Sequence, residues 1–393
     1  MKNYIFDKLF LFVFYLFFAL SYFDNHFFYN FKFIGIILIS IFYVFDIAKN
    51  NKIALIKSKE QIVILVLTFF LIFMLGIELY ISNHGFVSIE KYLSIIILFT
   101  ISFFILPYFI LKIGIVKNNY LICISLLIAI LLSFFIRPDF TNFIINGRFR
   151  MKAYFIHPNT LGNLTFVGIL FTLYNGIYNK NKSSSIFTKL LFIIFIGIMI
   201  LSGSRTSIYS SIIFLLLIFY FNIFKQSNKQ NKYLLSSLLI FFFVIFIALL
   251  MNTFNINMLN KITSNRVKLS IEALKYLVGN NSLFFGLGSF MNTLGSIYNY
   301  TTLDNSYVMI LYQNGTLGLT SVIIFLLSLI YLIIKYKKYS ILNKNYIIAF
   351  YITFLIYCSF EGYILTLGNL YTVLFYAYIW VYFIDGSKAK NFL

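Results

Sequence analysis

The sequence predicts an all-α polytopic membrane protein with about twelve transmembrane helices and one long outer loop. Of the 393 residues, 61% are hydrophobic and only 11% are charged. Apolar runs of about 20 residues, the length that spans a bilayer, recur along nearly the whole chain. We therefore expect a single integral membrane domain over residues 1–393. The net charge of +20 indicates basic cytoplasmic loops rather than nucleic-acid binding.

Hydropathy and length divide the chain into the expected spans. The tenth span is interrupted near Asn314–Gly315. The spans cover residues 5–22, 31–48, 61–82, 92–111, 119–136, 159–178, 186–202, 206–224, 233–251, 305–334, 345–361 and 366–384.

Lysines follow the second, fourth, sixth, eighth and tenth spans and lie near both chain ends. Because cytoplasmic loops are enriched in basic residues, we expect both termini to be cytoplasmic. The lysines that assign these segments to the cytoplasmic side are Lys2, Lys8, Lys49, Lys52, Lys57, Lys59, Lys112, Lys117, Lys180, Lys182, Lys189, Lys225, Lys229, Lys232, Lys335, Lys337, Lys338, Lys344, Lys388 and Lys390.

The arginines have the opposite distribution, because all of them fall in expected outer loops. They are Arg137, Arg148, Arg150, Arg205 and Arg266. The planar guanidinium group suits bidentate contact with phosphate oxygens. A single outer arginine is explained by contact with lipid headgroups, whereas the complete bias favours a shared anionic ligand.

Two outer loops, residues 137–157 and 252–304, stand out. The second is too long for a plain helix connection and contains "NRVKLSIEALKYLVG", which has helical periodicity and a plausible C-terminal cap at Gly279. We expect this amphipathic helix to lie on the membrane surface, to hold Arg266 over a cavity, or both. Its expected apolar face consists of Val267, Ile271, Leu274 and Val278.

The motif "GRFRMKAYFIHPNTLG" (residues 147–162) places Arg148 and Arg150 before a helix start. Proline is well tolerated at the first helical position, so a helix is expected to begin at Pro158, followed by Asn159. Its outward N-terminus would attract an anion. His157 is equally consistent with a capping or interfacial residue and with a catalytic one.

In "SGSRTS" (residues 202–207), Ser202, Ser204 and Thr206 can cap the helix ends that flank a tight turn. Arg205 then lies at a helix N-terminus, where the helix dipole disfavours a cation. A bound anion would relieve this conflict, so we expect Arg205 and the helix end to bind one phosphate together.

Two further segments carry candidate residues. In "FFGLGSF", Gly286 and Gly288 allow a left-handed or closely packed backbone. In "TLDNSYVMILYQNGTLGL", Asp304 is expected to cap the tenth span; alternatively it is a general base beside the arginines. Gly315 and Gly318 mark an interruption that is typical of kinked or re-entrant backbone lining a cavity.

Glu78 and Glu361 lie near the outer ends of spans, where we expect them to reach the interface, although acids within spans are often functional. The sequence suggests neither a metal site nor a disulfide, and it lacks a Walker-type nucleotide motif. The scattered histidines and cysteines are His26, His84, His157, Cys123 and Cys358.

The ordered set "RFRMKAYFIHPNTLG", "LSGSRTS", "NRVKLSIEALKYL", "LFFGLGSF" and "LDNSYVMILYQNGTLGL" resembles the bacterial O-antigen ligase and polymerase superfamily, including Wzy-type polymerases. The resemblance covers roughly residues 137–320, the motif-bearing core, while the first half of the chain matches only in hydropathy. Many relatives carry His-Asn where this chain has Asp304-Asn305. This departure weakens a histidine base at that position and favours the polymerase branch.

The resemblance implies a glycosyltransferase of the bacterial cytoplasmic (inner) membrane with its active site on the outer face. Such enzymes use undecaprenyl-diphosphate-linked glycans without metal, nucleotide or other cofactor. A polymerase of capsule, exopolysaccharide or O-antigen transfers the growing glycan to a lipid-linked acceptor, and a ligase transfers it to another acceptor such as lipid A core. Other expected partners are membrane lipid, a flippase and a chain-length regulator.

In the light of this resemblance, we hypothesise roles for individual residues. Asp304 or His157 would activate the acceptor hydroxyl. The diphosphate would be bound by Arg148, Arg150, Arg205 and Arg266. Supporting residues would be Asn159, Ser204, Gly286, Gly288 and Asn305.

Two classes besides the ligase compete with a polymerase. A lipid-linked oligosaccharide flippase or other transporter shares the span count, but transporters often have internal repeats and broken helices at the bilayer midplane. Here no clear repeat is found and the polar residues gather at the outer rim. A scaffold of a cell-envelope complex would use the outer loops for partner contact and would tolerate loss of single arginines.

Overall fold

The structure is a computed structural model that describes residues 4–50, 58–81, 85–137, 144–145, 148–178, 182–226, 266–288, 303–336 and 340–384. Regular structure in these ranges is helical, apart from isolated bridges such as Phe23–Phe155 and a two-residue antiparallel pair. In this pair, β1 (Ile144–Ile145) and β2 (Arg148–Phe149) align Ile144 with Phe149. The predicted all-α class is therefore confirmed for the described part of the chain.

Helices lie at every expected span except residues 233–251, which are outside the described residues. The helices are α1 (Ile5–Leu20), α2 (His26–Tyr29), α3 (Phe31–Asn50), α4 (Lys59–Ile81), α5 (Gly85–Thr100), the π-helix η1 (Ile101–Ile105), α6 (Leu106–Ile113), α7 (Ile115–Ile136), α8 (Pro158–Tyr178), α9 (Lys182–Ser202), α10 (Arg205–Gln226), α13 (Arg266–Gly279), α15 (Ser306–Lys335), α16 (Lys344–Cys358) and α17 (Leu370–Tyr382).

Within the described residues, six helical stretches are long and apolar enough to cross a membrane. Shorter apolar helices, including α16 and α17, pack among them. The chain is thus a helical membrane protein. The six stretches are His26–Lys49, Lys59–Ile77, Ile89–Ile113, Ile115–Ile136, Pro158–Tyr178 and Ser306–Lys335.

Helix α17 forms the centre of the bundle. Every residue from Leu370 to Tyr382 is buried, and the helix contacts α1, α5, η1, α6, α8 and α16. A helix that is apolar on all sides is stable only when other helices surround it. The outer helices are therefore arranged around this last described helix of the chain.

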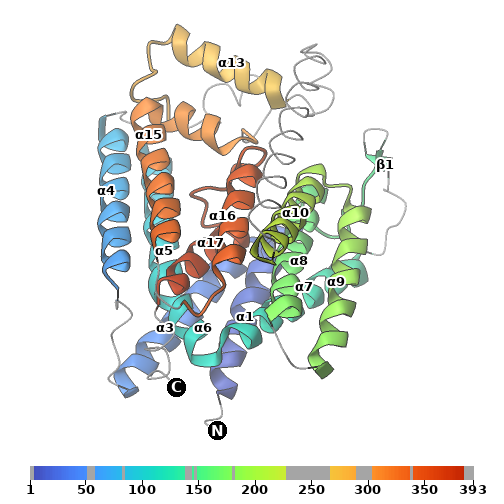
Figure 1. The fold of residues 1–393 in the computed structure, drawn as a ribbon. Helices are drawn as coiled ribbons and strands as arrows, with labels where there is room; N and C mark the ends of the chain where they lie inside the picture. The colour runs from blue at the N-terminus through green and yellow to red at the C-terminus, as the bar shows by residue number, and fades with distance from the viewer. Residues whose placement is uncertain are drawn as a thin grey trace.

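The motif-bearing segments and the chain ends lie at opposite ends of the bundle. Figure 1 shows α13 and β1 at one end, with the N- and C-terminal marks at the other. We call the end that carries α13 the motif end. Helices α8, α10 and α15 begin at this end, and α16 ends there, so their termini gather in one region.

Helix α15 contains the interruption expected near Asn314–Gly315. Gly315 has φ +64° and ψ −167°, which breaks the helical hydrogen-bond ladder, and buried backbone groups released by a break need other partners. The segment before the helix supplies them: Leu287 N–H donates to Tyr312 C=O (2.8 Å), Gly288 N–H to Gln313 C=O (3.1 Å), Thr316 N–H to Leu283 C=O (2.8 Å) and Leu317 N–H to Phe284 C=O (3.4 Å).

Gly286 and Gly288 serve this kink. Both have positive φ angles, +77° and +70°, as expected from the sequence. A Cβ atom on Gly286 would lie 2.5 Å from the Gln313 carbonyl, and one on Gly315 would lie 2.1 Å from the Phe284 oxygen. The glycines therefore permit two backbones to touch, and the role that the structure gives them is to support α15.

Helix α13 is present as expected, but the face that packs on the protein is a different one. Its buried residues are Leu269, Ala273 and Leu277. Three residues of the expected apolar face remain exposed, namely Ile271, Leu274 and Val278. The buried residues follow Arg266 at intervals of about one helical turn, so they lie on the same face of the helix as Arg266. The contacts of the Arg266 side chain, described below, and the packing on α15 therefore set the rotation of the helix.

We predict that Gly315→Ala destabilises the protein by on the order of 3 kcal/mol, because it combines left-handed backbone strain with a backbone clash. Thermal unfolding in detergent should show a lower Tm. Gly279→Ala is the matched control, since a Cβ there meets nothing within 4 Å. An unchanged Tm in Gly315→Ala would contradict the assigned role of the kink.

Candidate functional site

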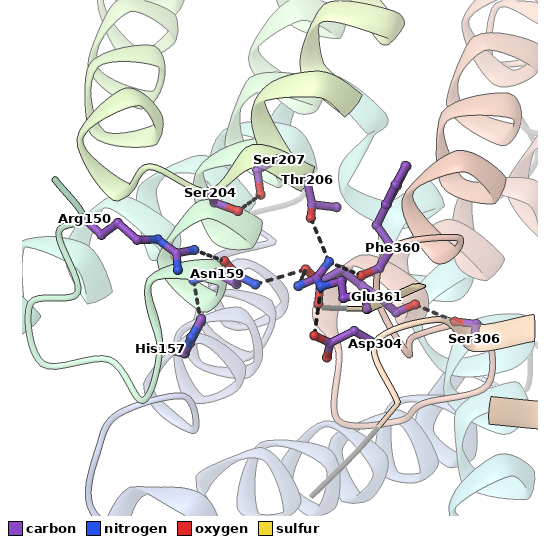
Figure 2. A network of polar contacts seen from close by, with 11 residues as sticks. Arg150, His157, Asn159, Ser204, Thr206, Ser207, Asp304, Ser306, Phe360 and Glu361 are labelled. Atoms are coloured by element: carbon purple, nitrogen blue, oxygen red, sulfur yellow. Dashed lines mark hydrogen bonds and ion pairs between the residues drawn. The ribbon is translucent and has the colours of Figure 1, made fainter. Parts of the chain in front are cut away.

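Polar side chains from distant segments meet at the motif end in a group that we call the outer cluster (Figure 2). Its members come from the loop before α8, the first turns of α8, α10 and α13, the segment before α15 and the loop after α16. They are Arg150, Asn159, Thr206, Arg266, Asp304 and Glu361.

Arg266 lies at the centre of the outer cluster. Its Nε is 2.9 Å from Asp304 Oδ2 and its Nη2 is 3.3 Å from Glu361 Oε1. Nη1 donates to the Thr206 hydroxyl at 3.3 Å and to the Phe360 carbonyl. All three guanidinium nitrogens are therefore used, and the geometry is the planar, multidentate kind that arginine forms and lysine does not.

Glu361 is the most buried charged member of the outer cluster. Its side chain is only 6% exposed, and Oε1 accepts hydrogen bonds from Arg266 Nη2 and from Asn159 Nδ2 at 3.2 Å. Burial raises the pKa of Glu361 from 4.5 to about 7, although Arg266 and a hydrogen bond with Thr206 oppose this rise. The expectation that Glu361 reaches the interface is wrong, because α16 ends at Cys358 and the following loop turns into the protein.

Asn159 links the second arginine to this carboxylate. Its Oδ1 accepts a hydrogen bond from Arg150 Nη2 at 2.8 Å, while its Nδ2 donates to Glu361. Arginine can only donate, so Asn159 Oδ1 must face Arg150, and this leaves Nδ2 to donate to Glu361 Oε1. Arg150 and Arg266 are thereby joined in one continuous hydrogen-bonded path.

The loop that carries Arg150 is held by backbone contacts with α9 and with the turn after α1. Met151 N–H donates to Leu201 C=O at 2.9 Å, and Asp24 N–H donates to Tyr154 C=O at 2.9 Å. Lys152 and Asp24 form an ion pair at 2.6 Å. These contacts position a segment that has almost no regular structure of its own.

His157 is the N-terminal cap of α8, which begins at Pro158 as expected. Its Nδ1 accepts the Asn159 N–H at 3.1 Å, and its own N–H donates to the Thr160 hydroxyl at 3.1 Å. The surrounding protein desolvates the imidazole, and Arg150 repels its charged form, so both lower the pKa of His157. The neutral ring accepts through Nδ1 and therefore carries its proton on Nε2, where it can act as a donor.

Asn305, and not Asp304, caps α15. The Asn305 side chain accepts the N–H groups of Tyr307 and Val308 at 3.0 and 3.2 Å. The expectation that Asp304 is the cap is therefore wrong, and its carboxylate turns to Arg266 instead. The Asp304 side chain is 43% exposed, which makes it the more accessible of the two acids.

Ser306 ties the start of α15 to the loop after α16. Its hydroxyl donates to the Glu361 carbonyl at 2.6 Å and accepts the N–H groups of Tyr363 and Ile364 at 2.7 and 3.2 Å. Asp304 and Glu361 are thus held on segments that are bonded to each other. Sequence reasoning missed this role, and no pattern at Ser306 distinguishes it from an ordinary first-turn serine.

The "SGSRTS" turn lies between α9 and α10. Gly203 has φ +58°, and the Ser204 N–H donates to the Ser202 hydroxyl at 3.2 Å. Ser204 is fully buried and bonds Ser207 Oγ at 3.0 Å. Thr206 is inside the first turn of α10 and bonds Arg266, so its expected role as a cap is wrong.

Ser204, directly before α10, packs closely against Gly162 of α8. A Cβ atom on Gly162 would lie 2.3 Å from Ser204 Cβ, so the absence of a side chain lets the two helices touch. Ser204 therefore supports the outer cluster through packing. Glycine at position 162 is part of the motif quoted above, but its role depends on a partner 42 residues away in the sequence.

The other outer arginines are placed less centrally. Arg205 is the first residue of α10 and is half-buried next to Thr206. Arg148 belongs to β2, and its side chain is outside the described part of the structure. Arg137 follows the last residue of α7. Of the predicted arginines, Arg150 and Arg266 are those joined through Asn159 and Glu361 by the hydrogen bonds described above.

The outer cluster combines arginines that can bind anions with carboxylates that can accept protons. One acid is accessible and the other is buried with a raised pKa, the kind of difference that separates acid–base roles in active sites. Among the described residues, no group of three or more His, Cys, Asp or Glu side chains is placed to hold a metal ion.

The raised pKa of Glu361 makes stability depend on pH. The folded protein holds the Glu361 proton more tightly than the unfolded chain, so this stabilisation is complete below about pH 4.5 and is lost as the pH rises through 7. We expect the wild-type Tm to fall over this range. Glu361→Gln should have a flatter profile because the amide does not ionise.

Glu272→Gln, on α13 but outside the outer cluster, is the control and should keep the wild-type slope. Equal slopes for the wild type and Glu361→Gln would contradict the assignment of this titration to Glu361.

Comparison with known proteins adds no family to this description. No protein-family model matches the chain, and no curated protein matches it. Its function is therefore inferred from the outer cluster and from the order of the sequence motifs.

Proposed function

We propose that the protein is a polymerase of undecaprenyl-diphosphate-linked oligosaccharide repeat units. In this proposal the chain crosses the bacterial cytoplasmic membrane twelve times with both termini in the cytoplasm, so the motif end faces outward. The observation that carries the proposal is the joining of Arg150 and Arg266 through Asn159 and Glu361 at that end. The motifs that resemble the O-antigen ligase and polymerase superfamily supply all of these residues except Glu361.

The arginines would bind the diphosphate of the donor. As the bond between the sugar and the diphosphate breaks, the electron pair moves to the phosphate oxygen and negative charge grows there. Cations that are already oriented stabilise such charge without reorganisation. Glu361 and Asn159 keep the guanidinium groups of Arg266 and Arg150 oriented before the substrate binds.

Asp304 is the best candidate for the base that accepts the proton of the acceptor hydroxyl. It is the more exposed acid of the outer cluster, and in the free protein its carboxylate is paired with Arg266 Nε. A diphosphate that competes for Arg266 would release Asp304 for this task. Glu361 is better suited to positioning, since its contacting oxygen is already bonded and its side chain is buried.

In this scheme His157 is a hydrogen-bond donor and does not act as the base. With Nδ1 occupied by a backbone N–H, the neutral imidazole has a donor at Nε2. It would donate a hydrogen bond to a phosphate oxygen or to a sugar hydroxyl. Arg150 lies close enough to influence its pKa, so both would act on the same part of the substrate.

The proposal is tested by incubating the purified protein with a lipid-linked repeat unit and separating the products on a gel. The wild type should produce a ladder of longer glycans. Arg266→Ala should lower kcat/KM by about 100-fold, the usual cost of losing one preorganised donor, and Arg266→Lys should restore little because an ammonium group lacks the planar fork.

Lys275→Ala is the matched control, since Lys275 is an exposed cation on the same helix. Full activity of a folded Arg266→Ala protein would refute the assigned role.

The two possible roles of His157 are separated by His157→Asn. Asparagine is a favoured N-cap, so this variant keeps the cap and removes the imidazole donor. We expect an unchanged Tm and a fall in kcat of about 10-fold or more. Wild-type kcat with an unchanged Tm would show that His157 is only a cap.

A ligase, a flippase and a scaffold remain the alternative functions. A ligase would transfer the glycan to an acceptor that is not a lipid-linked repeat unit, and the same assay would give no ladder. Deletion of a polymerase should leave single repeat units exposed outside, whereas deletion of a flippase should leave none. A scaffold would be unaffected by Arg266→Ala.

A further inference from the structure

A cavity lies at the end of the bundle opposite to the outer cluster. Tyr178 ends α8 and Lys344 begins α16, whereas Asn159 lies in the first turn of α8 and Glu361 lies in the loop after α16. The cavity, of about 560 Å³, opens between the end of α8, the start of α16 and the start of α7. We call it the distal pocket, and it is lined mainly by residues 114–117, 174, 178 and 340–343.

The first turn of α7 forms one wall of the distal pocket. Its N-cap is Gly114, which has φ +94° and no side chain to bond the first N–H groups. The helix ladder begins with the Asn118 N–H, which donates to Gly114 C=O at 3.0 Å, so the N–H groups of residues 115–117 point out of the ladder. Such a helix end carries partial positive charge and orients donors towards an anion.

Tyr174 supplies an independent observation on the opposite wall. The residue is only 5% exposed, and among the described residues its hydroxyl has no hydrogen-bond partner. Neighbouring Tyr346, against which its ring packs at 4.8 Å, instead donates to Leu170 C=O at 3.0 Å. A nearly buried phenol that lines a cavity and lacks an acceptor is available to donate to a ligand.

The charge of the lining also favours an anion. Lys117 is exposed at the rim, and the described lining residues include neither aspartate nor glutamate. Asn343 Oδ1 already caps α16 by accepting the N–H groups of Asn345 and Tyr346. The donors that line this pocket include the first N–H groups of α7, the Tyr174 hydroxyl and Lys117. Together they present N–H, O–H and ammonium donors to one volume.

We propose that the distal pocket binds a phosphoryl group, carried either by an acidic phospholipid or by a soluble phosphate ester. The ligand would accept hydrogen bonds from the first turn of α7 and from Tyr174, and its charge would be balanced by Lys117. The assignment is independent of the proposed polymerase activity, because none of these residues belongs to the outer cluster.

The test uses the full-length purified protein in a neutral detergent and measures binding of dioctanoyl phosphatidate by titration calorimetry. Dioctanoylglycerol, which has the same chains and no phosphate, is the ligand control. Tyr174→Phe, which keeps the ring, and Lys117→Ala should each weaken phosphatidate binding by roughly tenfold, as expected for loss of a hydrogen bond or ion pair to a charged group. Lys275→Ala, at the motif end, should bind like the wild type.

Inorganic phosphate distinguishes the two sources of the ligand. Competition by inorganic phosphate that Lys117→Ala weakens would support a soluble ester, whereas binding of phosphatidate alone would support a lipid. The proposal is overturned if dioctanoylglycerol binds as tightly as phosphatidate, or if Lys117→Ala binds phosphatidate like the wild type. Because Lys117 is exposed, its removal should leave the Tm unchanged, so this variant decides the question even if Tyr174→Phe is unstable.

Discussion

The buried carboxylate of Glu361 is the contact on which the motif end depends. Burying an ionisable acid is costly unless donors surround it, and here they come from α8 and α13. Without either donor, the buried carboxylate would lack a hydrogen-bond partner. Stabilisation of Glu361 therefore requires α8 and α13 to stay beside the loop that carries it. Because burial raises the pKa of Glu361 to about 7, desolvation outweighs the compensation that these donors supply.

This arrangement explains several features that are otherwise unrelated. The rotation of α13 follows from the direction of the Arg266 side chain, which places Leu269, Ala273 and Leu277 against α15. The break at Gly315 lets the segment that follows α13 bond directly to α15. Ser306 then joins α15 to the loop of Glu361. The outer cluster is thus supported by backbone contacts on each side and does not rely on the side chains alone.

Hydropathy and helix signals predicted much of the fold because they are local. Apolar runs gave the helix positions, Pro158 marked a helix start, and Gly315 marked a break. The outer cluster was only partly predictable. Asp304 and Asn305 are both favoured caps, and only the tertiary position of Arg266 decides which of them turns away. Glu361 follows an apolar run, and its burial depends on a loop whose path is set by Ser306, 55 residues earlier.

The position of α17 has a consequence for how the protein is made. The helix that fills the middle of the bundle is the last described one to be synthesised, and α1, α6 and α8 all contact it. While the nascent chain is still on the ribosome, these earlier helices would sit in the bilayer around an unfilled space. Packing around α17 must therefore come after the synthesis of all the other described helices.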